Sequence, residues 1–384
     1  MDFLPMNFCV FRLCGAWKKR KESNLIIRFA SFCHRYAIVI SIYYFTASMI
    51  IRLVHIRNNI EELMESLFIT LTFVHLCLKY TNFLARQFEV RALLDSFHAK
   101  LCQPKNSAEE SILKRYSRKA NQIAWFYMIL CQMTGLFFII SPVLASDKRP
   151  LPYKVYVPYS IAPLFPYVLT YIQQATTLTC SIALNTSCDT LIYGLIIYTC
   201  GQIELLCHRM METFRYLGEN EIEARKINAI ENVVIAECVK HHISMYNIIY
   251  KIQSLFVWTV AILFFFSLVT LCTTIYQMSK KNLFSLEFIT LTLYLGAMLF
   301  QTFLYCWYSN ELDLKAKYIA HAIYASNWTV ISAKQRKSLL LVMMISQRGK
   351  ILSTYGIFAL LLSTFTWILK TSYAAFNLLQ QTSS

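Results

Sequence analysis

The sequence contains little of what a soluble enzyme needs. Of its 384 residues, 15% are charged and only 8 are glycine. It has no glycine-rich phosphate-binding loop and no Gly-X-Ser-X-Gly nucleophile motif. Its 8 histidines include one adjacent pair, His241-His242, whose side chains point to different faces of a helix and do not converge on a metal ion. We therefore expect no enzymatic activity, no metal site and no cofactor.

Apolar residues dominate the rest of the chain. They make up 57% of it and are concentrated in seven stretches, each long enough to cross a hydrocarbon layer of about 30 Å. This composition predicts an all-α, polytopic membrane protein that forms one domain over residues 1–384. The expected spans are residues 32–54, 63–83, 123–145, 167–206, 255–277, 286–309 and 351–376.

Basic residues are distributed unequally between the two sets of alternating loops. Of the 37 Lys and Arg, 28 fall in residues 1–31, 79–122, 207–254 and 310–350, whereas 7 fall in the other set. Because cytoplasmic loops retain Lys and Arg, we expect a cytoplasmic N-terminus and an extracellular C-terminus, the reverse of a G-protein-coupled receptor. The net charge of +16 favours contact with anionic membrane lipid and not with nucleic acid.

Two long segments on the basic side combine charged and apolar residues at helical spacing. They are residues 84–122 and 208–252. The pattern predicts that the spans continue as helices beyond the bilayer, each with an apolar face that needs a protein partner. A repeated subunit would supply that partner.

Proline marks the outside segment from residue 147 to residue 166, which holds five of the 8 prolines. Proline removes backbone donors and disfavours helix in the preceding residue, so the segment is expected to be irregular. Its residues Tyr153, Tyr156 and Tyr159 have two interpretations. They lie at the depth of the lipid headgroups, or the segment is a cap over a ligand cavity. No cysteine falls in the outside loops, which argues against a disulfide-stapled exterior.

Few polar residues lie within the spans. Asn185 and Asp189 are one turn apart in the fourth span, and His75 is in the second. We expect Asp189 to make a structural hydrogen bond or ion pair inside the bundle, because a buried membrane carboxylate needs a partner. Lys370 is the only charge in the last span. We expect its ammonium group to face a water-filled pathway, to reach the membrane interface or to form an ion pair.

Four segments carry distinctive motifs. Residues 304–312 read LYCWYSNEL, residues 339–351 read LLLVMMISQRGKI, and residues 364–380 read TFTWILKTSYAAFNLLQ. The stretch from residue 189 to residue 204 begins with Asp-Thr-Leu and ends with Cys-Gly-Gln-Ile-Glu. These segments resemble the fourth span, the sixth span and the two C-terminal signatures of the insect odorant receptor family. The resemblance covers the whole chain in length and number of spans.

The resemblance implies a ligand-gated, non-selective cation channel in the plasma membrane of sensory-neuron dendrites. Members of this family assemble as tetramers of a tuning subunit with a common co-receptor subunit. The chain lacks the co-receptor's long insertion between the fourth and fifth spans, so it resembles a tuning subunit. One alternative is a gustatory-type receptor that acts as a homotetrameric channel, although Gln380 is not followed by Phe as in that family. Another is a non-channel receptor with a cytoplasmic partner site.

The family resemblance also implies that the last spans line the pore. Residues that share one side of the last expected span are Leu369, Tyr373, Phe376, Asn377 and Gln380. If that side faces the axis, Phe376 forms an apolar constriction, with Asn377 and Gln380 as a polar outer mouth. The alternative is that Tyr373 and Phe376 pack against the fifth and sixth spans.

The ligand site that the family implies lies in the outer halves of spans two to six, beneath the proline-rich loop. Residues expected at that depth are Phe68, Leu71, Thr72, Gln132, Gly135, Phe138, Ile139, Tyr171, Ala175, Leu178, Phe266, Thr273 and Tyr294. Such a pocket suits a small volatile molecule held by shape and dispersion. For each residue alone, packing between helices is an equally good explanation.

Overall fold

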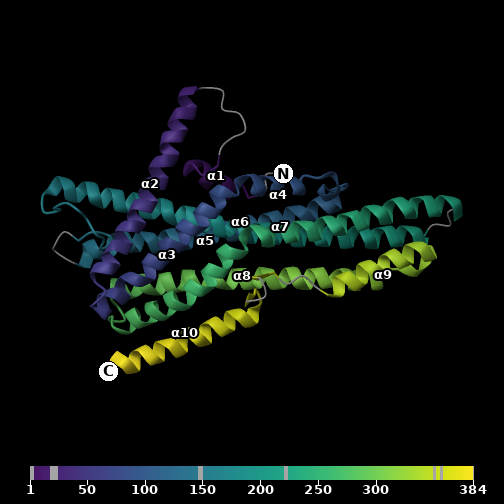
Figure 1. The fold of residues 1–384 in the computed structure, drawn as a ribbon. Helices are drawn as coiled ribbons and strands as arrows, with labels where there is room; N and C mark the ends of the chain where they lie inside the picture. Colours follow the sequence, from purple (N-terminus) through teal and green to yellow (C-terminus); the bar gives the residue numbers. More distant parts are fainter. Residues whose placement is uncertain are drawn as a thin grey trace.

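A computed structural model describes residues 4–17, 25–145, 150–219, 224–348, 352–354 and 358–383. Long helices form most of this part of the chain (Figure 1). The helices are α1 (Pro5–Leu13), α2 (Leu25–His55), α3 (Ile60–Ala85), α4 (Gln87–Phe97), α5 (Ser107–Ala145), α6 (Leu164–Glu219), α7 (Ala224–Ser279), α8 (Leu286–Tyr324), α9 (Ala333–Gln347) and α10 (Leu362–Ser383). The short elements are the 3-10 turns η1 (Lys100–Cys102) and η2 (Trp328–Val330) and the strands β1 (Ser353–Thr354) and β2 (Phe358–Ala359).

Six helices of the described part are long and apolar enough to cross a membrane. They are α2, α3, α5, α6, α7 and α8, and they contain the first six expected spans. The expectation of a helical membrane protein is confirmed.

The last expected span is wrong at its N-terminal end. Helix α10 begins at Leu362, whereas we expected helix from residue 351. Strand β1 pairs antiparallel with β2, and the Leu360 amide donates to the Leu352 carbonyl oxygen over 2.9 Å. Hydropathy alone does not distinguish a short apolar hairpin from a helix, which is why the sequence pattern missed this break.

Helices α6 and α7 are much longer than a membrane is thick. Each has 56 residues, which corresponds to about 84 Å at the rise of an α-helix. Figure 1 shows both running side by side to the end of the molecule where α9 lies. The prediction that the spans continue as helices over residues 208–252 is confirmed on both sides of the undescribed residues 220–223. Over residues 84–122 it is confirmed only for the part of α5 that begins at Ser107, because α3 ends at Ala85 and α4 is a separate helix.

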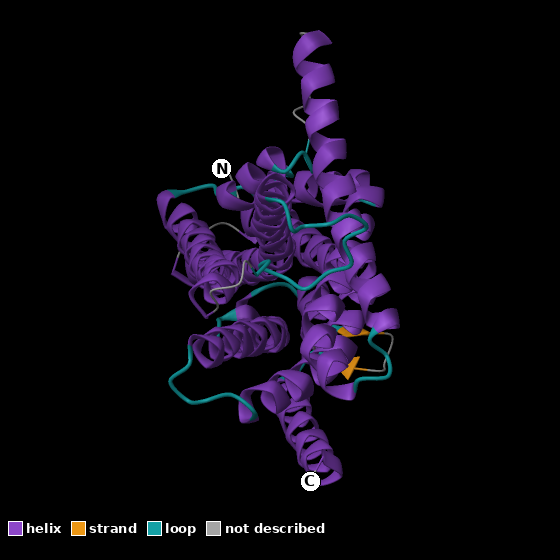
Figure 2. Cartoon of the chain, turned by 90° about the vertical axis from the view of Figure 1, so that its left-hand side faces the viewer, coloured by secondary structure: helices purple, strands orange, loops and turns teal. Residues whose placement is uncertain are grey.

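Helix α6 is the centre of the bundle. In its most apolar stretch 94% of the residues are buried, compared with 28% in α2 and in α5. Figure 2 looks onto the end of the molecule that lies on the left in Figure 1, and α10 projects from one edge of the bundle. Helices α1, α2, α3, α5, α7 and α8 all pack on α6.

Helix α1 packs against α6 although no feature of the sequence predicted this contact. The Asn7 side chain donates to the Ser187 carbonyl oxygen over 2.8 Å and to the Thr190 hydroxyl over 2.6 Å. A side chain at Gly194 would place its Cβ 2.6 Å from Leu4, so glycine is what permits this close approach.

A buried ion pair joins α3, α6 and α8. The Lys79 ammonium lies 2.7 Å from Asp189 Oδ1 and 2.7 Å from Asn185 Oδ1, and the side chains of the ion pair are 3% and 0% exposed. The Tyr305 hydroxyl donates to Asp189 Oδ1 over 2.8 Å, and Gln301 Nε2 donates to Oδ2 over 2.6 Å. The expected partner of Asp189 is therefore present. Our assignment of Lys79 to a cytoplasmic loop is wrong, since its charge is neutralised within the bundle.

A second, largely buried ion pair fastens the turn between α4 and α5 to α6. Arg209 Nη2 lies 2.8 Å from Glu109 Oε2, and their side chains are 10% and 5% exposed. The same guanidinium donates to the carbonyl oxygens of Leu101 over 2.6 Å and Gln103 over 2.7 Å. Four donor contacts thus hold this turn against the extended part of α6.

We expect Asp189→Ala to reduce the free energy of unfolding by about 3–5 kcal/mol, because it leaves the Lys79 charge buried without its partner. The double variant Lys79→Met, Asp189→Leu is expected to recover most of this loss. The measurement is thermal unfolding of the detergent-purified chain. Lys114→Ala is the control, because its pair with Glu110 is exposed and contributes at most about 1 kcal/mol. Equal stability of Asp189→Ala and the control would contradict the prediction.

Candidate functional site

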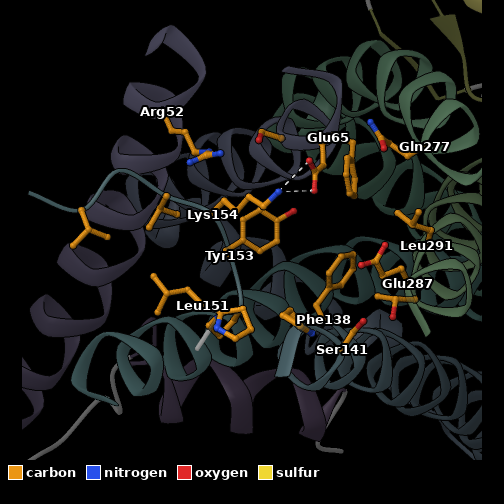
Figure 3. A pocket seen from close by; sticks show the side chains of 18 of the residues that line it. Arg52, Glu65, Phe138, Ser141, Leu151, Tyr153, Lys154, Gln277, Glu287 and Leu291 are labelled. Atoms are coloured by element: carbon orange, nitrogen blue, oxygen red, sulfur yellow. Dashed lines mark hydrogen bonds and ion pairs between the residues drawn. The ribbon is translucent and has the colours of Figure 1, made fainter. Parts of the chain in front are cut away.

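A large cavity in the described part of the chain lies where α2, α3, α5, α7 and α8 end, and we call it the chamber. Its volume is about 870 Å³, within the range of ligand pockets. The residues that line it are Arg52, Glu65, Ser66, Phe68, Phe138, Ser141, Pro142, Pro150, Leu151, Pro152, Tyr153, Lys154, Val155, Val157, Tyr159, Ile161, Gln277, Lys281, Glu287, Thr290 and Leu291. Figure 3 shows the chamber from close by.

An irregular segment, residues 150–161, forms one wall of the chamber, and we call it the strap. Its backbone is held by three hydrogen bonds to neighbouring helices, one of which the Tyr167 hydroxyl donates to the Pro150 carbonyl oxygen over 3.0 Å. The Tyr153 amide donates to Gln174 Oε1 over 3.1 Å, and the Tyr156 amide donates to the Ser48 carbonyl oxygen over 3.3 Å. The predicted irregular conformation is confirmed over residues 150–163, whereas α6 already begins at Leu164 and residues 147–149 lie outside the described part. The strap lies against a cavity, as the cap interpretation requires.

Two ion pairs lie in the wall of the chamber. Lys154 Nζ of the strap lies 3.2 Å from Glu65 Oε1 of α3, the contact that the dashed lines mark in Figure 3. Lys281 Nζ lies 2.5 Å from Glu287 Oε2 at the turn between α7 and α8. Each of the two carboxylates that line the chamber is therefore balanced by a lysine.

Aromatic rings form the inner wall. The ring centroids of Phe68 and Phe138 lie 5.2 Å and 6.0 Å from that of Tyr294, and the Phe138 ring lies 6.3 Å from Tyr153. These separations are those of favourable aromatic pairs. The Tyr294 and Thr72 hydroxyls are hydrogen-bonded at 2.6 Å. Burial raises the pKa of the Tyr153 phenol well above its usual value, so this side chain stays neutral at physiological pH.

The structure brings eight of the thirteen expected ligand residues into two neighbouring groups. Those that line the chamber or pack in the aromatic cluster beside it are Phe68, Phe138, Ile139, Leu178 and Tyr294. Those that line a smaller adjoining cavity are Leu71, Thr72 and Phe266. His75, Asn185 and Gln301 share the smaller cavity, which therefore reaches the partners of the buried ion pair.

The other five expected ligand residues line neither cavity. Gln132 Nε2 donates to the Thr179 carbonyl oxygen over 3.3 Å, and the Tyr171 hydroxyl donates to Ile139 over 2.9 Å. The Thr273 hydroxyl donates to a carbonyl of its own helix. Gly135 and Ala175 complete this group. Gly135 packs closely on Ile182, because a Cβ at Gly135 would lie 2.3 Å from Ile182 Cδ1. The roles of these five residues stay predictions.

Helix α10 carries the residues expected to line a pore. It packs on α7 and α8, with the Phe365 ring 5.6 Å from that of Phe303. Tyr373 is 61% exposed, and Lys370 is exposed on the same side. The remaining expected pore residues that the structure describes, Leu369, Phe376 and Asn377, are half-buried, and the side chain of Gln380 lies outside the described part.

Sequence reasoning missed the charged residues of the chamber. Arg52, Glu65 and Glu287 all lie near the ends of expected spans. In a hydropathy analysis a charged residue at such a position marks only the end of the span and does not indicate a site. One feature of the sequence could have indicated these residues. The expected outside loops hold few basic residues, yet both acidic and basic residues occur in and beside them. The pairing of Glu65 with Lys154 needs the fold, because 88 residues separate them.

The sequence profile of the family described as 7tm Odorant receptor matches residues 59–373. The chain is 23% identical to Odorant receptor 46a, isoform A, of Drosophila melanogaster, over 97% of this chain and 96% of that one. It is also 23% identical to Odorant receptor 13a of the same organism, over 89% and 84%. The structure is similar to that of the olfactory receptor OR5 from Machilis hrabei in complex with eugenol, with a TM-score of 0.84 at 16% identity, covering 98% and 97% of the two chains.

We expect Gln174→Ala to loosen the strap. Gln174 is 1% exposed and accepts the Tyr153 amide, so its removal leaves that donor unpaired at a cost of about 1–3 kcal/mol. Trypsin cleavage after Lys154 is expected to become roughly tenfold faster, because protease attack follows local opening. Gln173→Ala is the matched control, since among the described residues the Gln173 side chain donates to Thr177 of its own helix and makes no hydrogen bond to the strap. Equal cleavage rates for the two variants would show that Gln174 does not hold the strap.

Proposed function

Because the chain belongs to the 7tm odorant receptor family, we propose that it is the odorant-binding tuning subunit of a ligand-gated, non-selective cation channel in the plasma membrane of olfactory neurons. The observation that carries this proposal is the aromatic-lined chamber beneath the strap. The solved complex of Machilis hrabei OR5 holds eugenol, a small aromatic molecule, within the same fold. A ligand of that size and character suits the inner wall of the chamber.

The ligand binds between the strap and the aromatic cluster. The rings of Phe68, Phe138 and Tyr294 supply dispersion contacts, and the hydroxyl pair of Thr72 and Tyr294 supplies one hydrogen-bonding position. A ligand that prefers the open arrangement of the helices increases its population. The smaller cavity, of about 10 Å³, is lined by Asn185 and Gln301, which are partners of the buried ion pair that joins three helices.

Assembly with the co-receptor uses the parts of α6 to α9 that extend beyond the bilayer. Large apolar side chains there are exposed in the single chain, among them Val233, Ile243, Leu314, Leu341 and Met344. Such side chains outside a membrane need protein contact, and a tetramer supplies it. The gustatory-type homotetramer would use the same surface, and no particular feature of the structure favours it.

Helix α10 crosses the membrane as the seventh span and lines the pore. The gate is the constriction at Phe376, and ligand binding moves the outer end of α10 away from the axis. Lys370 lies on the exposed side of α10 with Tyr373. In a mixed tetramer only the tuning subunits contribute this positive charge, so it does not form a complete ring around the path of the cations.

Epitope tags test the proposed topology. The excess of basic residues in the loops of one set supports a cytoplasmic N-terminus. A C-terminal tag is therefore expected to bind antibody on intact cells, and an N-terminal tag only after permeabilisation. Staining of an N-terminal tag on intact cells would overturn the orientation and the channel proposal with it.

Whole-cell current tests the channel itself. Cells expressing the chain with a family co-receptor, under blocked G-protein signalling, are expected to pass rapid cation current when a panel of volatiles is applied. Phe376→Ala is expected to raise the ligand-free current roughly tenfold, because it removes the apolar constriction and shifts the closed–open equilibrium by about 1.4 kcal/mol. Phe284→Ala is the control, since Phe284 is 96% exposed in a turn. Current from the chain alone would favour the homotetramer.

A further inference from the structure

We propose that the chamber is a binding site for small carboxylates, and that Arg52 is the residue that holds the carboxylate group. The inference rests on the proposed function and specifies the chemical class of the ligand. It starts from the charges of the chamber wall, which are Arg52, two lysines and two glutamates.

Four of these five charges neutralise one another. Lys154 pairs with Glu65 at 3.2 Å, and Lys281 pairs with Glu287 at 2.5 Å. Arg52 is the remaining charge among the described residues of the wall, which together carry one positive charge in excess. An anionic ligand complements this excess, and a cationic ligand is repelled by it.

The guanidinium of Arg52 makes only weak interactions with the described residues around it. Its one ion pair joins Nη2 to Glu62 Oε2 at 3.7 Å, which is longer than a charge-assisted hydrogen bond of about 2.7–2.9 Å. Glu62 also accepts from Asn59 Nδ2 at 3.3 Å, and its side chain is 46% exposed. Arg52 Nε is buried and has no hydrogen-bond partner among the residues that the structure describes. A buried donor without a partner is unusual and calls for an acceptor.

A carboxylate is the acceptor that fits this donor set. The N–H groups of a guanidinium form a planar fork that matches the two oxygens of a carboxylate. An alcohol offers a single neutral oxygen, and an alkylamine is positively charged at neutral pH. The fork therefore selects an acid over an alcohol or amine of the same chain length.

The rest of the chamber suits the apolar body of such an acid. In Figure 3, Arg52 enters from α2 on one side of the chamber, and Phe138 and Leu291 lie on the other, with Tyr153 between them. A short alkyl or aromatic acid can place its carboxylate at Arg52 and its body on these apolar side chains. The strap then covers the ligand, because Tyr153 and Lys154 belong to it.

The test is equilibrium binding to the purified full-length chain in lipid nanodiscs, with hexanoate, hexanol and hexylamine as probes. We expect hexanoate to bind roughly tenfold more tightly than hexanol, and hexylamine to bind least. Arg52→Gln is expected to abolish the preference for hexanoate, and Arg52→Lys to keep only part of it. Arg57→Gln is the matched control, because Arg57 is exposed in the following turn and does not line the chamber.

Thermal unfolding of each variant first establishes that it is folded. If Arg52→Gln is not folded, the binding comparison is made with Arg52→Lys instead. Wild-type affinity of hexanoate for Arg52→Gln, equal affinities of the wild-type chain for hexanoate and hexanol, or no binding of hexanoate would each overturn the proposal. The current in cells that also express the co-receptor tests the proposed channel function independently of the binding measurement. Hexanoate binding without current supports the site and contradicts the channel, whereas current that responds equally to hexanol and hexanoate supports the channel and contradicts the site.

Discussion

The carboxylate of Asp189 holds the bundle together at its centre. One lysine, one tyrosine and one glutamine side chain donate to it from α3 and α8, and α6 carries it. A buried charge of this kind is stable only when its partners stay in place, because each lost donor leaves an unpaired group in a low-dielectric interior. The relative positions of α3, α6 and α8 are therefore constrained at one depth of the bundle.

The same constraint links the candidate ligand site to the rest of the molecule. Asn185 and Gln301 are partners of the ion pair and also line the smaller cavity beside the aromatic cluster. A ligand that moves α3 or α8 must therefore rearrange charged hydrogen bonds and not only apolar contacts. Apolar packing permits many small displacements, whereas a charged network has few alternatives, which suits a transition between two discrete states.

Much of the architecture could be predicted from the sequence. Hydropathy located six helices, and the helical spacing of charged segments indicated their extension beyond the spans, since both signals depend only on neighbouring residues. The two paired strands before α10 were missed because residues 351–362 as a whole are apolar enough to continue the expected span. Lys79 was misplaced because a lysine near the end of an apolar run is usually solvated, and only contact with Asp189 makes its burial possible.

The chamber shows where the sequence stops being sufficient. By itself the sequence determined the class of fold, a helical membrane protein, and through its motifs it indicated the family, because composition and local patterns carry that information. Only the tertiary structure decided that Glu65 pairs with Lys154 and that Arg52 has no such partner within the chamber wall. These facts depend on residues that are distant in the chain and adjacent in space, and no pattern along the sequence encodes which charge remains in excess.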